Sequence, residues 1–541
     1  MRSSTNVTTE RRILCVFPHY TPSFGTFSHA YRLMRGVKAF MPPQGLLVVA
    51  AYMPASWPVR FIDENIAPAT AADLAWADVV MISGMHIQAP QIRDIHCRAK
   101  AAGKITVLGG PSVSAAPEMY PEIDYLHVGE LGDSTDRLIA QLDASLEPPP
   151  AQIRFETQDR LPMYDFPIPA YDLVALKSYL LCTIQFSSGC PYRCEFCDIP
   201  GLYGRQPRMK SPQQITAELD AMCSQKGHPA SVYFVDDNFI GNRKAARDLL
   251  PHLVQWQKDR GYPMVLSCEA TLNIAKQTEI LSLMREAAFT GMFVGIETPE
   301  ADALKAMRKD QNNAVPLMQS IKTLNDYGIE VTSGIILGLD TDTDDTESRL
   351  KEFIELSKIP MLTINLLQAL PKTPLWDRLK RDGRLDSDAK RESNVRFLRP
   401  YDEVVATWRR AIGYANDPER LFARFKHQVD ATYVNRLVPP ARGKLTWSAL
   451  SGAAVMAFRC VYYIGIRADY RRPFWRAVRY ALRRGLIGDA LAMSFISRHL
   501  IEFTREALRG EQNASFYSHT RKERDGELAP VRALARGSRS A

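Results

Sequence analysis

The sequence has no apolar stretch long enough to span a membrane. A spanning helix needs about 18–20 consecutive apolar residues, and the nearest candidate, residues 445–458, is shorter and ends at Arg459. The first residues, MRSSTNVTTERR, contain no apolar core, so no secretory signal is expected. These absences predict a cytoplasmic protein.

The nine cysteines also lack the paired spacing of a disulfide framework. Six are scattered, and we interpret them as small buried hydrophobes. They are Cys15, Cys97, Cys182, Cys223, Cys268 and Cys460. The other three, Cys190, Cys194 and Cys197, form a CxxxCxxC motif with Phe196 directly before the last sulfur. This use of cysteine suits a reducing compartment and a metal site rather than cross-links.

The CxxxCxxC motif supplies three thiolates in one loop, one fewer than a Cys₄ iron–sulfur site uses. On a [4Fe–4S] cluster this leaves one iron open to a substrate or cofactor. Zinc is an alternative, but zinc sites use a second CxxC-like or Cys/His pair, and none follows here. Buried free cysteines are the third interpretation. We expect the cluster.

Short apolar runs alternate with helical stretches between residues 12 and 143. This alternation predicts βαβ units, in which a parallel sheet carries helices on both faces. The expected strands are residues 12–17, 59–63, 78–83, 104–110 and 124–130. Ligands of such sheets bind beyond the carboxyl ends of the strands, where the chain has Gly109, Gly110 and Gly129. These glycines either admit a bulky ligand or simply turn the chain.

A second region of strands and helices follows a proline-rich stretch. Residues 144–172 are predicted to be a semi-rigid linker because proline favours neither helix nor sheet. From residue 173 to 375 we expect a (β/α)₆ partial barrel with functional side chains at the carboxyl ends of its strands. Its later strands are expected at residues 231–239, 264–273, 291–300, 331–343 and 362–375.

Together these motifs resemble the cobalamin-binding radical S-adenosylmethionine (SAM) family. The resemblance rests on CxxxCxxC with its aromatic residue, on the preceding βα region, and on VDDNF (235–239) and GIETP (295–299). It implies an α/β chain with a doubly wound cobalamin-binding domain (1–143), the linker (144–172), a radical SAM partial barrel (173–375) and a mostly helical domain (376–541). It also implies three cofactors: a [4Fe–4S] cluster, SAM, and cobalamin as methylcobalamin.

The same resemblance implies roles for individual residues. Catalysis and cluster binding fall to Cys190, Cys194 and Cys197. The SAM pocket would contain Phe196, Asp237, Asn238, Glu269, Gly295 and Glu297. The corrin would contact Gly84, His86, Gln88, Gly109, Gly110 and Gly129. For the carboxylate and amide residues, the alternative is ordinary helix capping.

The loop after the first strand departs from DxHxxG, a motif that supplies a lower-face cobalt ligand in many cobalamin proteins. It reads FPHYTPSFG, with Phe17 in the place of the aspartate and no glycine three positions after His19. Coordination of cobalt by His19 is therefore not expected, and the lower face is expected to be open or water-bound.

Over its whole length the chain resembles the hopanoid 2-methyltransferases. The resemblance rests on GCPYRCEFCDIPGLYGR, FVDDNFIGN and TPLWDRL. It implies methylation of an unactivated carbon of a hopanoid lipid, at position 2 of ring A, through a 5′-deoxyadenosyl radical and methylcobalamin, with a ferredoxin or flavodoxin as reductant. A porphyrin cyclase or natural-product methyltransferase would use the same cofactors. A cobalamin or redox sensor is the alternative outside enzymes, but it would not need the SAM-pocket segments.

Positive charge gathers at the carboxyl-terminal end. Residues 441–541 contain 19 Lys/Arg and 8 Asp/Glu, in a chain whose net charge is +8. One expected helix carries Arg472, Arg476, Arg479 and Arg483 on one face and Phe474, Val478, Ala481, Leu482 and Leu486 on another. Basic amphipathic helices bind anionic membrane surfaces, so we expect peripheral contact with the inner face of the cytoplasmic membrane. The alternative is packing on the barrel with a solvated arginine face. No nucleic-acid partner is expected, because no recognition module is present.

Overall fold

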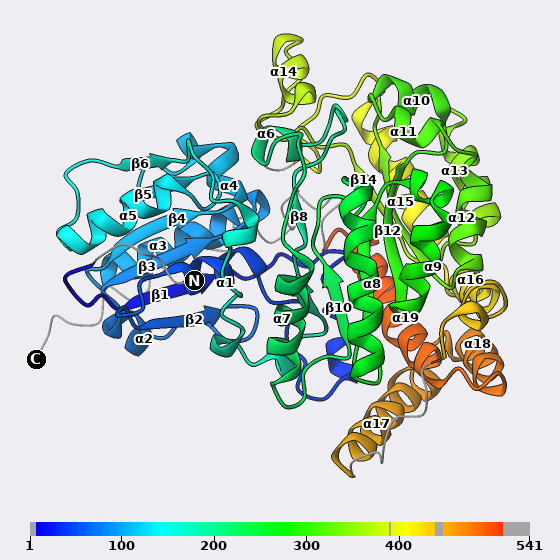
Figure 1. Ribbon diagram of the computed structural model, residues 1–541. Coiled ribbons are helices and arrows are strands. Elements are labelled where there is room, and N and C mark those ends of the chain that lie inside the picture. The colour runs from blue at the N-terminus through cyan, green and yellow to red at the C-terminus, as the bar shows by residue number, and fades with distance from the viewer. Residues whose placement is uncertain (1–6, 389–390, 439–446, 512–541) are drawn as a thin grey trace, which may run out of the picture.

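The computed structural model describes residues 7–388, 391–438 and 447–511, without the side chains of residues 447–450. These residues form two six-stranded parallel sheets with helices packed around them, and a carboxyl-terminal group of helices (Figure 1). A two-stranded antiparallel ribbon lies near the second sheet. The α/β fold class expected from the sequence is confirmed.

The first sheet has the strand order β2-β1-β3-β4-β5-β6. Its strands are β1 (Ile13–Phe17), β2 (Val59–Asp63), β3 (Val79–Ser83), β4 (Ile105–Gly109), β5 (Tyr125–Val128) and β6 (Ile153–Glu156). Successive side chains of a strand point to opposite faces, and those of β1 alternate between two cores. Ile13 and Cys15 pack with α1 (Gln44–Tyr52) and α5 (Asp133–Ala144). Leu14 and Val16 pack with α2 (Ala71–Trp76) and α3 (Ala89–Ala101). The sheet is therefore doubly wound.

Strand β6 falls inside the stretch that the sequence predicts as a linker. It pairs in parallel with β5, and Phe155 enters the core of the first sheet. The four residues IRFE lie between proline-rich segments, so an edge strand could form there without placing proline in the hydrogen-bonded ladder. The stretch 144–172 thus contributes to the first sheet before the chain crosses to the second.

The second sheet has the order β14-β13-β12-β11-β10-β7. Its strands are β7 (Cys182–Ile184), β10 (Ser231–Phe234), β11 (Val265–Ala270), β12 (Phe289–Glu297), β13 (Glu330–Leu337) and β14 (Leu362–Leu366). The connecting helices include α7 (Pro212–Cys223), α8 (Arg243–Asp259), α9 (Thr278–Glu286), α12 (Leu317–Asp326) and α13 (Thr346–Ser357). Strands β7 and β14 are the two edges of this sheet. It is therefore an open barrel of parallel strands.

The carboxyl-terminal helices pack on the open barrel. They are α14 (Pro374–Arg381), α15 (Tyr401–Ala415), α16 (Pro418–Ala431), α17 (Trp447–Cys460), η9 (Val461–Ile466), α18 (Arg471–Arg483) and α19 (Ile487–Leu508). Buried Trp408 of α15 donates its indole N–H to the carbonyl of Ile364 in β14, at 2.8 Å. Among the described residues, no helix has the length and apolar character that crossing a bilayer requires.

Helix α18 is amphipathic as its sequence predicts, and its apolar face is used within the protein. Two residues predicted for that face do not belong to it, because Leu482 is exposed and Leu486 follows the end of the helix. Phe474, Val478 and Ala481 are buried in the core that α18 shares with α16 and α19. The four arginines at 472, 476, 479 and 483 are exposed. Packing therefore accounts for the apolar side of this helix and leaves its basic side on the surface.

Candidate active site

The cysteine loop begins at the carboxyl end of β7, where the barrel strands open. The ribbon of β8 (Ser187–Ser188) and β9 (Arg208–Met209) flanks it. The Cys190 N–H donates to the carbonyl of Gly204 at 3.2 Å. Gly189 adopts a positive φ of 95°, and a Cβ at this position would lie 3.0 Å from the Gly204 carbonyl oxygen. Only glycine allows the two sides of the loop to approach this closely.

Two aspartates at the end of β10 hold this loop by its backbone. Asp236 accepts hydrogen bonds from the N–H groups of Phe186 and Ser187. Asp237 accepts one from the N–H of Gly189 at 2.8 Å. Burial raises the pKa of Asp236 to about 6 and that of Asp237 to about 7. Asp237, predicted as a SAM contact, therefore also fixes the residue that precedes Cys190.

The three cysteines offer a thiolate set that suits an iron–sulfur cluster. Cys194 is buried, Cys190 and Cys197 are half-buried, and burial raises the pKa of both half-buried thiols. In the part of the chain that the structure describes, no three His, Cys, Asp or Glu side chains converge closely enough to hold a single metal ion. The thiolates of a cubane cluster bind different irons and stand farther apart than the ligands of one zinc ion. The set fits a cluster.

The predicted SAM residues of β12 lie beside the cysteine loop and meet a residue that the sequence did not single out. Lys309 forms a buried ion pair with Glu297 and lies 5.5 Å from the centre of the Phe196 ring. A Cβ on Gly295 would come within 2.5 Å of the Glu297 carboxylate and 2.6 Å of the Lys309 ammonium. A side chain at 295 would therefore displace the ion pair.

The two remaining SAM candidates, Glu269 and Asn238, differ in whether their polar atoms already have a hydrogen-bond partner within the protein. Glu269 accepts a hydrogen bond from Tyr233 at 2.9 Å, and burial raises the pKa of this glutamate to about 7. Asn238 is buried, and its amide nitrogen has no hydrogen-bond partner within the protein. A buried unsatisfied donor is costly unless a bound molecule or water accepts from it. Asn238 therefore has a donor free for a cofactor.

The corrin candidates occupy loops at the carboxyl edge of the first sheet. The order 2-1-3-4-5 places a switch point between β1 and β3, where such sheets bind ligands. Gly84 and the turn η2 (His86–Gln88) follow β3 at this point. Gly110, with φ 91°, follows β4 beside Gly109, and Gly129, with φ 108°, follows β5. The structure brings all of these residues to one edge.

The two polar side chains of the η2 turn are used differently. Gln88 is fully buried, donates to the Pro18 carbonyl at 2.6 Å and accepts from the Met85 N–H at 2.9 Å, so it braces two loops. His86 places Nδ1 3.2 Å from the Ser112 hydroxyl, while its buried Nε2 has no partner within the protein. Burial lowers the pKa of His86. His86 thus presents a neutral imidazole nitrogen without a partner.

The loops at the carboxyl edge of the first sheet contact the cysteine loop. Glu130, next to Gly129, accepts from the Ser188 hydroxyl at 2.8 Å and pairs with Arg208 at 2.5 Å and Arg160 at 3.3 Å. Lys372 donates to the Ser114 carbonyl at 2.5 Å. None of these bridging residues was singled out from the sequence. The one available signal was an acidic residue beside a loop glycine.

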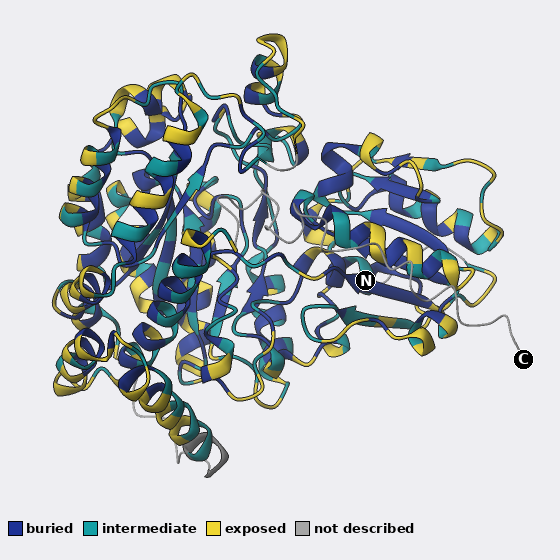
Figure 2. Ribbon diagram, turned by 180° about the vertical axis from the view of Figure 1, so that it is seen from behind, coloured by how far each residue is buried: buried dark blue, intermediate teal, exposed yellow. Residues whose placement is uncertain are grey.

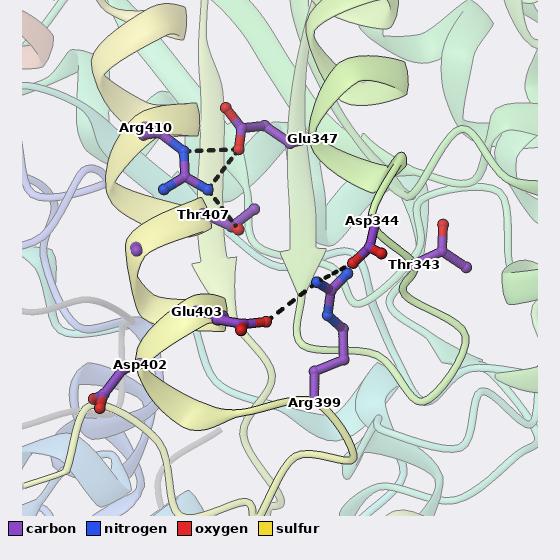
Figure 3. A pocket seen from close by; sticks show the side chains of 9 residues that line it. Thr343, Asp344, Glu347, Arg399, Asp402, Glu403, Thr407 and Arg410 are labelled. Atoms are coloured by element: carbon purple, nitrogen blue, oxygen red, sulfur yellow. Dashed lines mark hydrogen bonds and ion pairs between the residues drawn. The ribbon is translucent and has the colours of Figure 1, made fainter.

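A charged hollow lies away from these residues, on the surface between α13 and α15 (Figure 3). Arg399 pairs there with Asp344 at 2.6 Å and with Glu403 at 3.4 Å. Arg410 pairs with Glu347 at 2.7 Å. Asp402 also lines the hollow but lies apart from these pairs, and the hollow contains none of the predicted site residues.

Comparison with known families divides the chain in the same order as its folded regions. Residues 33–139 match the B12 binding domain, and residues 184–354 match the radical SAM superfamily. Residues 373–513 match a domain of unknown function (DUF4070). Cobalamin binding and radical SAM chemistry are thus both encoded in this chain.

Two relatives match nearly the whole chain. The hopanoid C-2 methylase of Rhodopseudomonas palustris is 59% identical, over 94% of this chain and 97% of that protein. An uncharacterized methyltransferase of a Synechocystis species is 32% identical, over 97% of this chain and 98% of that protein. The 59% identity, which extends over 94% of this chain, is sufficient to assign the chain to the family of this relative.

Among solved structures, the cobalamin-dependent SAM radical enzyme OxsB, with aqua-cobalamin bound, has a similar fold. Its TM-score is 0.57 at 14% identity, over 95% of this chain and 82% of that chain. The 59% identity with the hopanoid C-2 methylase, over 94% of this chain, confirms the resemblance seen in the sequence and does not support the sensor alternative. The chain belongs to the cobalamin-binding radical SAM methyltransferases, whose cofactors are a [4Fe–4S] cluster, SAM and cobalamin.

Proposed function

We propose that this enzyme methylates position 2 in ring A of a hopanoid lipid. The observation that carries the proposal is the 59% identity with a hopanoid C-2 methylase, which extends over 94% of the chain. A saturated ring carbon offers no nucleophile, so a polar methyl transfer cannot reach it. When bound, the cluster and SAM supply a radical that removes hydrogen from such a carbon, and cobalamin supplies the methyl group.

In this proposal the residues of the cysteine loop hold the cluster and its neighbours orient SAM. Cys190, Cys194 and Cys197 bind iron. Asp237 fixes the start of the loop through Gly189, and Asn238 donates from its unpartnered amide to the bound SAM. A small redox protein, such as a ferredoxin or flavodoxin, supplies the electron.

The loops after β3, β4 and β5 would hold the corrin against the cysteine loop. Gly84, Gly109, Gly110 and Gly129 lie in or beside these loops, and His86 faces the macrocycle with its unpartnered nitrogen. The ion pairs of Glu130 keep this edge against the ribbon beside the cluster. Two cofactors that must act on one carbon would thus be held in a fixed relation.

We also propose a peripheral contact with anionic membrane, made by an exposed apolar surface that we call the α17 patch. It consists of Phe458, Val461, Tyr462 and Ile466. Phe458 is 69% exposed and Ile466 is 58% exposed. The rings of Phe458 and Tyr462 stack with 6.2 Å between their centres. Helix α17 projects from the rest of the molecule (Figures 1 and 2).

Charge around the α17 patch suits a membrane surface rather than a neutral partner. Exposed Arg467, Arg471 and Arg472 follow the patch in the chain. Exposed aromatic and aliphatic side chains flanked by arginine are typical of elements that lie at the interface of anionic membranes. Contact of this kind would bring the enzyme to the bilayer in which its substrate resides.

The proposed reaction is tested by lipid mass spectrometry in a hopanoid-producing bacterium that has no methylase of its own. Expression of this chain is expected to add one methyl group to ring A of the hopanoid, and the Cys194→Ala variant is expected to add none. If the protein carries cluster and cobalamin but no methylated hopanoid forms, the hopanoid assignment is wrong. Another apolar ring compound would then be the substrate to seek.

A further inference from the structure

Gln311 reaches the cluster loop from a different part of the chain. It lies in α11 (Asp310–Asn313), is 9% exposed, and donates its side-chain N–H to the Cys194 sulfur at 3.4 Å. The other two cysteine sulfurs accept from backbone N–H groups of their own loop, those of Tyr192 and Ile199. Cys194 is also the most buried of the three. Its hydrogen bond therefore comes from outside the loop.

The segment that carries Gln311 is bonded both to the cysteine loop and to β12. The Glu195 N–H donates to the carbonyl of Met307 at 2.9 Å, which ties the segment to the cysteine loop. Asn312 donates to the Gly295 carbonyl at 2.8 Å, which ties it to β12. Lys309 adds its buried ion pair with Glu297. These contacts fix the backbone from which the Gln311 side chain reaches Cys194.

A hydrogen bond to a cluster sulfur stabilises the more negative, reduced state of the cluster. Hydrogen bonds to the sulfurs, net charge and solvent exposure set the reduction potential of iron–sulfur clusters. In a buried site with low dielectric, an N–H dipole pointing at a thiolate acts with little screening. The donor on Cys194 should therefore make the cluster easier to reduce.

We propose that Gln311 is a positioning residue whose N–H···S hydrogen bond to Cys194 raises the reduction potential of the [4Fe–4S] cluster. It orients one ligand of the cluster and adjusts the electron affinity of the site, and it does not touch the substrate. This role is independent of the lipid that the enzyme methylates.

The test is a redox titration of the reconstituted holoenzyme, followed by electron paramagnetic resonance. Gln311→Leu removes the N–H and keeps a side chain of similar volume. Its midpoint potential is expected to be more negative than that of the wild type, with unchanged iron content. Asn313→Leu is the matched control, since Asn313 lies in the same helix, is exposed, and donates to the Ala301 carbonyl. An unchanged midpoint in a fully loaded Gln311→Leu enzyme would overturn the proposal.

A second measurement decides the case if the leucine variant fails to load its cluster. The wild-type enzyme is labelled with ¹⁵N in the side-chain amide of glutamine, and its cluster is reduced. The hyperfine coupling between ¹⁵N and the reduced cluster is then recorded by pulsed electron paramagnetic resonance. A coupling that disappears in Gln311→Met supports the hydrogen bond. Absence of any glutamine coupling in the wild type refutes it.

Discussion

The thiol of Cys194 is expected to be indispensable for SAM cleavage. Its replacement by alanine removes one of three iron ligands, and two thiolates do not hold a cubane cluster. We expect Cys194→Ala to lose iron and to form no 5′-deoxyadenosine, as measured by iron analysis and chromatography. Cys97→Ala is the control, because Cys97 is exposed on α3, a helix that packs on the first sheet. Full cleavage activity in Cys194→Ala would contradict the cluster assignment.

Glu269 gives the stability of the protein a pH dependence with a definite sign. Burial raises the pKa of its carboxyl group from 4.5 to about 7, so between these values the folded state binds a proton that the unfolded chain has released. Stability from this group is therefore lost as the pH rises from about 4.5 through 7. In the Glu269→Gln variant, the side chain cannot titrate but can still accept the hydrogen bond from the Tyr233 hydroxyl.

The melting temperatures of the wild type and Glu269→Gln are thus expected to agree near pH 5 and to separate above pH 7. The variant should be the more stable protein at high pH, by at most about 3 kcal/mol. Thermal unfolding followed by circular dichroism at several pH values measures the difference. Parallel melting profiles for the two proteins across this range would show that the carboxyl group does not titrate as described.

Some residues of the site follow from the sequence and others depend on long-range folding. The spacing of Cys190, Cys194 and Cys197 predicts a cluster because those residues share one loop. Gln311 lies 117 residues from Cys194, and no local pattern links them. Glu130 pairs with Arg208, which is 78 residues away, and again no local pattern links the two residues. Contacts of this kind depend on how the strands and loops are arranged in the folded protein.

Helix α17 and the π-helix η9 form the element whose proposed role is membrane contact. Burying an exposed apolar side chain contributes about 1.5–3 kcal/mol when burial is complete. Replacing Phe458 and Ile466 together by serine is expected to weaken binding to anionic vesicles by about tenfold or more. Leu398→Ser is a matched control, since Leu398 is 67% exposed outside the patch. Equal loss in both proteins, measured by vesicle sedimentation, would refute a specific patch.

Helix α18 allows the contribution of charge to membrane binding to be measured separately from the contribution of apolar side chains. Each arginine near an anionic surface contributes about 1 kcal/mol, which salt screens. The quadruple change of Arg472, Arg476, Arg479 and Arg483 to glutamine should weaken binding to anionic vesicles but not to zwitterionic ones. The exposed pair of Arg476 with Glu419 is expected to matter little for folding. Unchanged vesicle binding would leave these arginines as a solvated face only.

At the level of elements, alternation predicted most strands. Strands β1 to β5 were expected because apolar runs are separated by helical stretches. Strand β6 was not, because it lies between proline-rich segments, and the ribbon β8–β9 was not, because two residues per strand carry too little pattern. Helix α18 was expected as amphipathic, but its sequence could not reveal that α16 and α19 cover its apolar face.

At the scale of the whole molecule, the ion pairs of Glu130 link a loop of the first sheet to the ribbon beside the cysteine loop. Glu130→Ala would leave Arg160 and Arg208 without this carboxylate, at a cost of about 1–3 kcal/mol. We expect faster cleavage within residues 144–172 by a nonspecific protease, by about tenfold. Glu147→Ala is the control, because Glu147 is exposed in the same region. Identical cleavage rates in the two variants would show that Glu130 does not secure the arrangement.

The order of the regions could be predicted from the sequence, but their arrangement could not. Each sheet buries its own apolar strands, so periodicity reveals each sheet separately. The contact between them combines single polar bonds, such as that of Lys372 with Ser114, and a few apolar side chains, such as Leu47 of α1, which packs in the core of the barrel. Neither kind of contact has a periodic signature. The same holds for His499, whose ring nitrogen bonds the Ser23 carbonyl at 3.0 Å and links α19 to the loop after β1.

Helices α14 and α17 lie at opposite ends of the molecule (Figures 1 and 2). The Leu375 N–H of α14 donates to the carbonyl of Glu195 at 3.0 Å, so the cysteine loop belongs to the end far from α17. An enzyme resting on the bilayer through α17 would therefore turn its reactive centre toward the water. A triterpenoid would have to be extracted whole before its ring could react, and turnover would then depend on how easily the lipid phase releases it.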